Sequence, residues 1–267
     1  MKHLLRIEFR KVFKNNIFWL TLGLYVFGMI IILIGTESFI NKVVSNANRN
    51  SPIPIPDFSL YAFPYIWHNL TYLAGFFKII LAFIVILFIS NEFNYNTIRQ
   101  NIITGLSREN FFITKVFFLI FLTFVSCMII IAVAIILGFT HTDDISISMI
   151  IIKSHFLAAY FLEVFAFLSF SMALSFIFKR AGVTIIVFSI YLFIVENILS
   201  FKLNEDYSKY LPLKTFGRLI DIPNTSLMKL FGVNFREYID PFDTVLTLIY
   251  TIILLTISYL IIKKSNW

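Results

Sequence analysis

The stretch Glu92–Lys115, EFNYNTIRQNIITGLSRENFFITK, is a polar segment between two long hydrophobic blocks, and it carries an internal pattern of its own. Thr97 can cap the start of a short helix through Ile103, because its hydroxyl can accept a hydrogen bond from a free backbone amide. Ile98 and Ile102 are four residues apart, so they form one apolar stripe on that helix. The pattern predicts a short docking helix. A solvated connector between membrane helices is the simpler alternative.

The residues that follow predict where this short helix ends and where the next one begins. Gly105 stands where a C-terminal glycine would close the short helix. Ser107 can then cap a much longer helix through the next hydrophobic block. The short helix would therefore connect two membrane spans.

The composition places the chain in a membrane. Of its 267 residues, 59% are hydrophobic and only 14% are charged, which is far from the balance of a soluble domain. The net charge of +7 does not indicate nucleic-acid binding, because the basic residues gather beside the hydrophobic blocks, where they orient a membrane protein. We expect membrane lipid and no nucleic acid as partners. The abundance of Phe, Ile, Lys and Asn is typical of an AT-rich bacterial genome, so we expect the bacterial cytoplasmic (inner) membrane.

The hydrophobic blocks predict an all-α, multi-pass protein with six transmembrane helices. Each block is long enough to cross a hydrocarbon core of roughly 30 Å at about 1.5 Å per residue. An even number of spans puts both termini on the same side of the membrane. The predicted spans are residues 17–35, 70–91, 110–139, 150–178, 183–201 and 243–262.

The basic residues near the spans predict that both termini are cytoplasmic, since Lys and Arg are enriched on that side. The short loops of the opposite side hold few basic residues, Lys42, Arg49 and Lys153. The basic residues assigned to the cytoplasmic side are Lys2, Arg6, Arg10, Lys11, Lys14, Arg99, Arg108, Lys115, Lys179, Arg180, Lys263 and Lys264.

Three further segments have a predicted structure. Residues 1–16 contain an amphipathic helix expected to lie in the cytoplasmic interface, with an apolar face opposite a basic stripe. Residues 179–182 form a tight basic turn between the fourth and fifth spans. Residues 202–242 form an extracytoplasmic loop with two short amphipathic helices, one opened by Pro212 and one capped by Thr225.

Ionisable residues inside the predicted spans are the remaining signal, since a charge in hydrocarbon requires a partner or a wet cavity. Lys78, Glu163 and Glu196 lie in the second, fourth and fifth spans, roughly 18 to 22 Å from the cytoplasmic ends. They form either a bridge that locks helices together, with Glu163 as the favoured partner of Lys78, or a polar patch on a transport path. Snorkelling to the membrane surface is a third alternative.

The chain carries no motif for catalysis or for holding a cofactor. No G-x-x-x-x-G-K-[ST] stretch is present, so ATP phosphates cannot be held by a P-loop in this chain. The four histidines are scattered without metal-ligand spacing, and the single cysteine, Cys127, lies in an apolar run. We therefore expect no enzyme, no metal site and no cofactor in the chain itself.

The loop resembles the first cytoplasmic loop of type-2 ABC transporter permeases. In that family an acidic residue ends one membrane helix and a Thr-hydrophobic-Arg element opens the coupling helix; the family's usual Gly before the Thr is Asn96 here. The resemblance extends over nearly the whole chain, through the N-terminal helix, the six spans and the outer loop. The residues that carry it are Glu92, Thr97, Ile98, Arg99, Gly105, Ser107, Arg108 and Lys115.

The resemblance implies that residues 1–267 form a single permease domain of an ABC exporter, with residues 92–110 as its coupling loop. Two permease copies would pair, as a homodimer or with a related permease, and each would dock a separate ATP-binding subunit that holds ATP and magnesium. The resemblance assigns partner contacts to the loop: Thr97, Ile98 and Arg99 transmit motion, Glu92 and Arg108 anchor it, and Ile102 completes the apolar stripe.

A function of another class also fits the sequence. An ATP-independent membrane scaffold or immunity protein could use the same loop to hold a cytosolic partner. The substrate of an exporter is not identified by the sequence, because lipid, peptide, glycan and antibiotic all suit an aromatic, weakly charged path.

Overall fold

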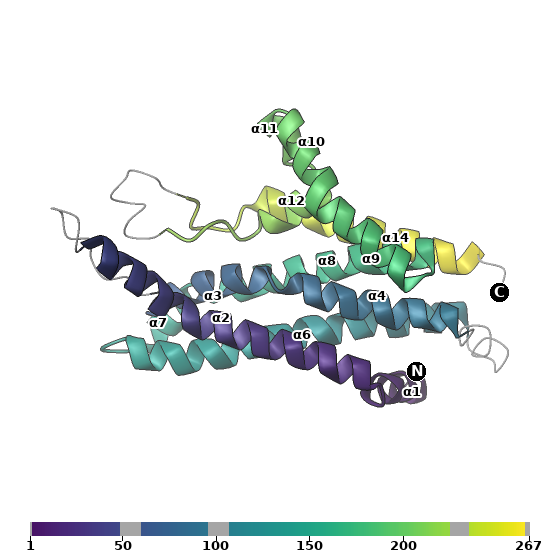
Figure 1. The fold of residues 1–267 in the computed structure, drawn as a ribbon, viewed down its shortest axis with the longest axis horizontal. Helices are drawn as coiled ribbons and strands as arrows, with labels where there is room; N and C mark the ends of the chain where they lie inside the picture. Colours follow the sequence, from purple (N-terminus) through teal and green to yellow (C-terminus); the bar gives the residue numbers. More distant parts are fainter. Residues whose placement is uncertain (1, 49–59, 96–106, 225–234, 265–267) are drawn as a thin grey trace.

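The computed structural model describes residues 2–48, 60–95, 107–224 and 235–264, and every regular element in those ranges is a helix. Most of the helices run side by side along the long axis of the molecule (Figure 1). The helices are α1 (Lys2–Phe13), α2 (Asn16–Asn48), α3 (Ile66–Gly75), α4 (Lys78–Asn94), α6 (Arg108–His141), α7 (Ile147–Ile152), α8 (His155–Phe178), α9 (Ala181–Ile190), a π-helical turn (Tyr191–Val195), α10 (Glu196–Lys202), α11 (Glu205–Ser208), α12 (Pro212–Gly217) and α14 (Pro241–Lys264).

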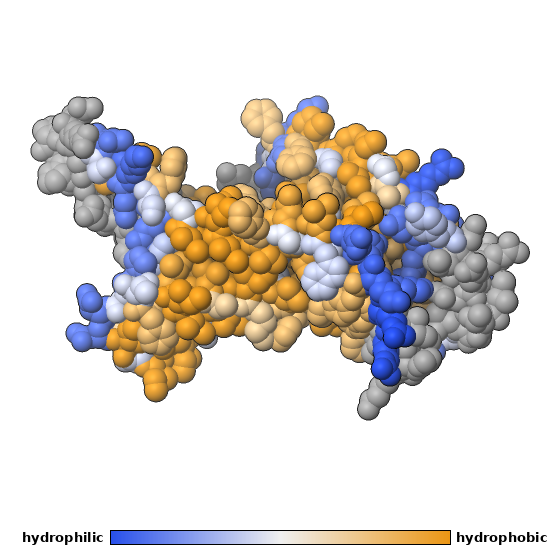
Figure 2. All heavy atoms as spheres, turned by 60° about the horizontal axis from the view of Figure 1, so that its bottom comes forward, coloured by the Kyte–Doolittle hydropathy of each residue, from blue (hydrophilic) through white to orange (hydrophobic). Residues whose placement is uncertain are grey.

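The helices are those of a multi-pass membrane protein. Five are long and apolar enough to cross a bilayer, and a sixth span results if the bent pair α3 and α4 is counted as one. Figure 2 shows a broad hydrophobic belt with hydrophilic residues gathered toward both ends of the molecule. This arrangement is expected for a helical bundle surrounded by lipid.

Helix α8 lies at the centre of the bundle, where it packs against α3, α4, α6 and α14. Its contact with α14 is close because α14 turns small polar side chains inward, and Thr247, Thr251 and Ser258 are all buried. The hydroxyl of each donates to a carbonyl four residues earlier in the same helix, at 2.7 to 2.8 Å. These hydroxyls are therefore satisfied without any partner on α8.

The second predicted span differs from the structure because it is broken. The sequence predicts a continuous span over residues 70–91, whereas the structure has α3 and α4 bent by 46° at Phe76 and Phe77. The backbone at the break forms tight turns, with Phe76 N donating to Leu73 O at 3.3 Å and Phe77 N donating to Ala74 O at 3.0 Å. No proline marks this break, so the hydropathy pattern runs through it without interruption.

The fifth predicted span is also less regular than expected. It consists of α9, a π-helical turn and α10, and it leans away from the other helices so that α11 lies to one side of the bundle (Figure 1). The turn before it follows Lys179, whose φ is 57°, and Ala181 already belongs to α9. The predicted basic turn over residues 179–182 is therefore shorter, but it joins α8 and α9 as a hairpin as expected.

The loop over residues 202–242 contains one of its two predicted helices within the described ranges. Pro212 occupies the first turn of α12, and the predicted apolar face is buried through Leu213, Phe216, Leu219 and Ile220. The second helix, predicted to begin at Thr225, lies outside the described residues.

One end of the bundle gathers both termini, the ends of α4 and α6 that flank residues 96–106, and the turn between α8 and α9 (Figure 1). Contacts hold these segments together: a guanidinium nitrogen of Arg108 donates to the carbonyl of Lys263 near the C-terminus. The Lys179 amine also lies 5.9 Å from the centre of the Phe93 ring at the end of α4. We call this end, formed by α1 and residues 92–95, 107–115, 179–182 and 259–264, the loop end.

The N-terminal helix α1 covers part of the loop end. Val12 is buried, and the rings of Phe9 and Phe13 lie 5.1 and 6.1 Å from the ring of Phe121 on α6. The basic residues Arg6 and Arg10 are exposed. Part of the predicted apolar face thus packs on α6, and the amphipathic, interfacial character of α1 stays a prediction.

Packing between α6 and the segment before α3 requires a glycine. A Cβ atom at Gly138 would lie 2.3 Å from the Phe63 ring, and Phe63 is itself buried between Trp67 and Phe139. We therefore expect Gly138→Ala to lower the free energy of unfolding by about 1 to 3 kcal/mol, even though Ala is the better helix former. Gly23→Ala is the matched control, since no atom lies within 4 Å of its Cβ position. Thermal unfolding in detergent measures both, and equal stability of the two variants would contradict this packing.

Candidate functional site

The candidate site has two parts, an ion-pair cluster at the loop end and a second ion pair deep between α4 and α8. In the first, Glu92 is only 6% exposed although it lies near the end of α4. One of its carboxylate oxygens lies 2.8 Å from the Lys115 amine on α6, and the other lies 3.7 Å from the Lys11 amine on α1. A single carboxylate therefore connects three helices.

Lys115 is an unusual lysine because its side chain is fully buried. Its amine lies 4.5 Å from the centre of the Phe88 ring and 4.9 Å from that of Phe111, in addition to its pairing with Glu92. Aromatic faces and a carboxylate together compensate a buried ammonium group for its lost hydration. Because the desolvated pair is costly to break, it holds the end of α4 at a fixed separation from the start of α6.

The other predicted residues of the loop fall into two groups. Ser107 caps α6 as predicted, and its hydroxyl oxygen accepts from Asn110 N at 3.2 Å. Arg108 contacts the C-terminal end of α14 through the carbonyl of Lys263, an interaction that the sequence did not indicate. The remaining predicted partner-binding residues, Thr97, Ile98, Arg99 and Ile102, lie outside the described residues.

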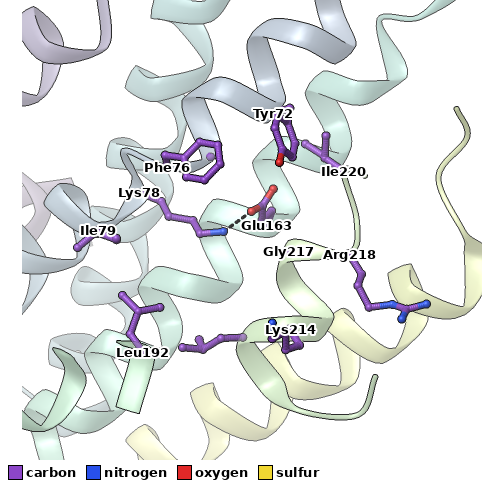
Figure 3. Close-up of a pocket in the computed structure, with 12 residues that line it drawn as sticks. Tyr72, Phe76, Lys78, Ile79, Glu163, Leu192, Lys214, Gly217, Arg218 and Ile220 are labelled. Atoms are coloured by element: carbon purple, nitrogen blue, oxygen red, sulfur yellow. Dashed lines mark hydrogen bonds and ion pairs between the residues drawn. The ribbon is translucent and has the colours of Figure 1, made fainter. Parts of the chain in front are cut away.

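The second part of the site is the ion pair between Lys78 and Glu163. The Lys78 amine donates to a carboxylate oxygen of Glu163 across the interface of α4 and α8 (Figure 3). The same amine lies 5.1 Å from the centre of the Phe167 ring one turn further along α8. Gly75 faces this carboxylate, so the break between α3 and α4 brings backbone and charge close together. Lys78 and Glu163 are thus paired in the structure, and a place for them on a transport path stays a prediction.

Glu196 does not join this pair. It is 2% exposed, and its carboxylate accepts from the backbone amide of Lys214 at 2.6 Å in the first turn of α12. The expectation that the fifth span presents Glu196 beside Glu163 stays a prediction, and the charge of Lys78 does act on the Glu196 carboxylate. The carboxylate fixes α12 against α10, because a helix start offers free amide donors that favour negative charge.

A cavity of about 460 Å³ opens beside the Lys78–Glu163 pair (Figure 3). Its walls come from the break between α3 and α4, the middle of α8, the π-helical turn and α12. Most of the lining is apolar, with Lys78, Glu163, Lys214 and Arg218 as its charged members. An apolar lining with a few charged groups suits an amphiphilic molecule.

Two polar networks were not predicted from the sequence. Deep between α2, α6 and α8, the hydroxyl of Ser126 lies 2.5 Å from that of Tyr25 and 2.7 Å from that of Tyr160. All three side chains are buried. Single hydroxyl-bearing residues on three distant helices have no spacing pattern, so only the packing of those helices brings them together.

The other network lies where α14 begins. Arg236 pairs with Asp240 at 3.0 Å and with the buried Asp243 at 2.9 Å, and Arg218 lies 3.4 Å from Asp243. Burial alone would lower the pKa of the Arg236 guanidinium, but the hydrogen bond to Asp243 and the nearby carboxylates together raise it. Asp240 also accepts from Phe242 N at 2.9 Å in the first turn of α14.

The chain was compared with protein-family models and with curated proteins. A family model described as "Protein of unknown function (DUF2705)" matches residues 28–267. No curated protein matches the chain. Within the described residues there is no group of three His, Cys, Asp or Glu side chains placed to hold a metal ion.

The Lys78–Glu163 pair can be tested by a double-mutant experiment. Lys78→Met leaves the Glu163 carboxylate buried without its cation, so we expect a loss of about 3 to 5 kcal/mol in stability. Adding Glu163→Gln to the same chain should restore much of it, because no unpaired charge remains. Membrane yield and thermal stability of the two single variants and the double variant measure the coupling. Small, additive effects would show that the pair does not hold α4 to α8.

Proposed function

The chain belongs to the DUF2705 family, and we propose that it is the transmembrane permease subunit of an ATP-driven exporter. In this proposal a separate ATP-binding subunit docks at the loop end, two permease copies pair in the membrane, and substrate moves outward between them. The support comes from the resemblance of residues 92–115 to a coupling loop and from the way the structure builds the surroundings of that loop.

The single observation that carries the proposal is the buried Glu92–Lys115 pair. A loop that only connects two spans needs no charged support beneath it. Here the residues on both sides of segment 96–106 are held by a carboxylate and an amine 2.8 Å apart, and Lys11 adds the N-terminal helix to the same carboxylate. A force applied to the loop would therefore reach α1, α4 and α6 together.

Helix α4 offers a route from the loop end to the cavity. It is fixed to α6 through Glu92 near one end and to α8 through Lys78 at the other. The two residues are separated by 14 positions, or roughly 21 Å at 1.5 Å per residue. In the proposed mechanism, closure of the ATP-binding subunits tilts α4 as a rigid strut and shifts α8 beside the cavity.

The docking role of the loop predicts the effect of a charge on its apolar stripe. Ile98→Asp combined with Ile102→Asp should release the ATP-binding subunit, because a charge would be buried at a small helix-in-groove contact. The permease itself should remain in the membrane at its normal level. Co-purification of an ABC ATPase with a tagged chain, and the ATPase activity of the complex, measure the loss.

The matched control adds the same charge to the same segment. Gln100→Glu combined with Asn101→Asp introduces two acids without touching the apolar stripe, so the ATPase should stay bound. If the stripe variant keeps its ATPase, the coupling assignment is wrong. If the native chain co-purifies with a cytosolic partner that does not bind ATP, the function is that of an ATP-independent scaffold.

A further inference from the structure

The charged side chains that line the cavity beside α4, α8 and α12 are three cations and one carboxylate. Lys78 pairs with Glu163, and Arg218 turns toward α14, where it lies 3.4 Å from Asp243 (Figure 3).

The third cation, Lys214, is exposed. Its backbone amide holds the buried Glu196 carboxylate, whose charge also acts on the Lys214 and Lys78 amines. The Lys214 amine itself forms no direct ion pair within the described ranges, so the cavity offers one cation that is uncommitted to such a pair, with a second at Lys78 that can be shared.

The apolar part of the lining reaches the outer surface of the bundle. Phe76 is 61% exposed at the break between α3 and α4, and Ile79 and Leu192 also line the cavity. Leu192 belongs to the π-helical turn of the span that leans away from the other helices (Figure 1). A molecule in this cavity can thus keep hydrocarbon chains among the apolar helix faces while a polar group reaches the lysines.

The volume limits what can enter. A cavity of about 460 Å³ accommodates a lipid headgroup with the beginning of its chains, but not a folded peptide. A phosphate group with a negative charge matches Lys214 and Lys78, since charge-assisted hydrogen bonds from lysine to phosphate are strong. From this geometry we propose that the cavity binds the headgroup of an anionic phospholipid, with the phosphate between Lys214 and Lys78.

Gly217 gives the proposal a steric test. It lines the cavity, it closes α12, and no atom lies within 4 Å of its Cβ position, so a larger side chain there fills empty space. Gly217→Leu should exclude the headgroup without a clash. Lys214→Gln should weaken binding by removing the uncommitted cation.

The experiment uses the full chain, purified in detergent and freed of native lipid, without any ATP-binding subunit. Native mass spectrometry measures the lipid retained after incubation with phosphatidylglycerol or with phosphatidylcholine of the same acyl chains. The native chain should retain phosphatidylglycerol in preference to phosphatidylcholine. Lys214→Gln should lower its retention by about tenfold, the effect of losing one charge-assisted hydrogen bond. Gly217→Leu should lower it at least as much, because its side chain occupies the space of the headgroup.

Two variants control for changes away from the cavity. Lys202→Gln removes an exposed lysine at the end of α10, and Gly23→Leu adds the same side chain at an exposed position of α2 with no atom within 4 Å. Both should retain phosphatidylglycerol like the native chain. Thermal stability and monodisperse elution identify a variant that fails to fold, and the charge variant and the steric variant test the site independently.

Three results would overturn the proposal. Unchanged retention in folded Gly217→Leu or Lys214→Gln would place the lipid elsewhere. Equal retention of phosphatidylcholine would show that negative charge is not recognised. Inorganic phosphate that binds as tightly as the lipid would show that the cavity recognises the free anion. None of these results depends on an ATP-binding partner. The lipid-site proposal can therefore be wrong while the exporter proposal is right, and the exporter proposal can be wrong while the lipid-site proposal is right.

Discussion

Charged groups inside a bilayer must find partners within the protein, because the hydrocarbon offers neither water nor counter-ions, and the arrangement of this bundle follows from that constraint. Glu163 lies on α8, the helix that most others contact, and the Lys78 amine reaches it because α4 begins at that lysine. A continuous second span would carry Lys78 in a different direction. The break after Gly75 thus allows Lys78 to pair with Glu163.

Helix α4 connects the two charged centres of the molecule. At one end its lysine pairs with a carboxylate on α8, and near the other its glutamate pairs with a lysine on α6. Both pairs are largely buried and both have a phenylalanine ring beside the amine. In the proposed mechanism a helix held in this way moves as a unit, and displacement at the loop end would be passed to the wall of the cavity. The same architecture would serve an exporter driven by a separate ATPase. It would also explain why the apolar cavity lies beside the Lys78–Glu163 pair, because that pair is where α4 contacts α8.

Local sequence signals predicted much of this structure. The hydrophobic blocks locate the apolar helices, Ser107 and Pro212 open the helices that they were expected to open, and the apolar face of α12 is its packed face. These features depend on residues close together in the chain, where capping and periodicity act. The Lys78–Glu163 pair was among the predicted alternatives because only a few ionisable residues lie inside the spans.

Other features depend on tertiary packing and had no local signal. The break at Phe76 and Phe77 contains no proline, and hydropathy alone cannot distinguish a bent span from a straight one. Glu196 was grouped with the other charges by its depth, but its partner is a backbone amide of α12, which no charge pattern indicates. Likewise, the Tyr25–Ser126–Tyr160 network joins three helices through residues that are ordinary in isolation.

The central claim is that the loop end faces the cytoplasm, since an ATP-binding subunit can dock there only from that side. Accessibility of single cysteines in a Cys127→Ala background tests it directly, with an impermeant thiol reagent applied to intact cells. The account predicts that cysteines at Asn50 and Asp143 react from outside, and that cysteines at Asn96 and Arg180 react only after the membrane is permeabilised. Labelling of Asn96 or Arg180 in intact cells would contradict the orientation and with it the docking role of the loop.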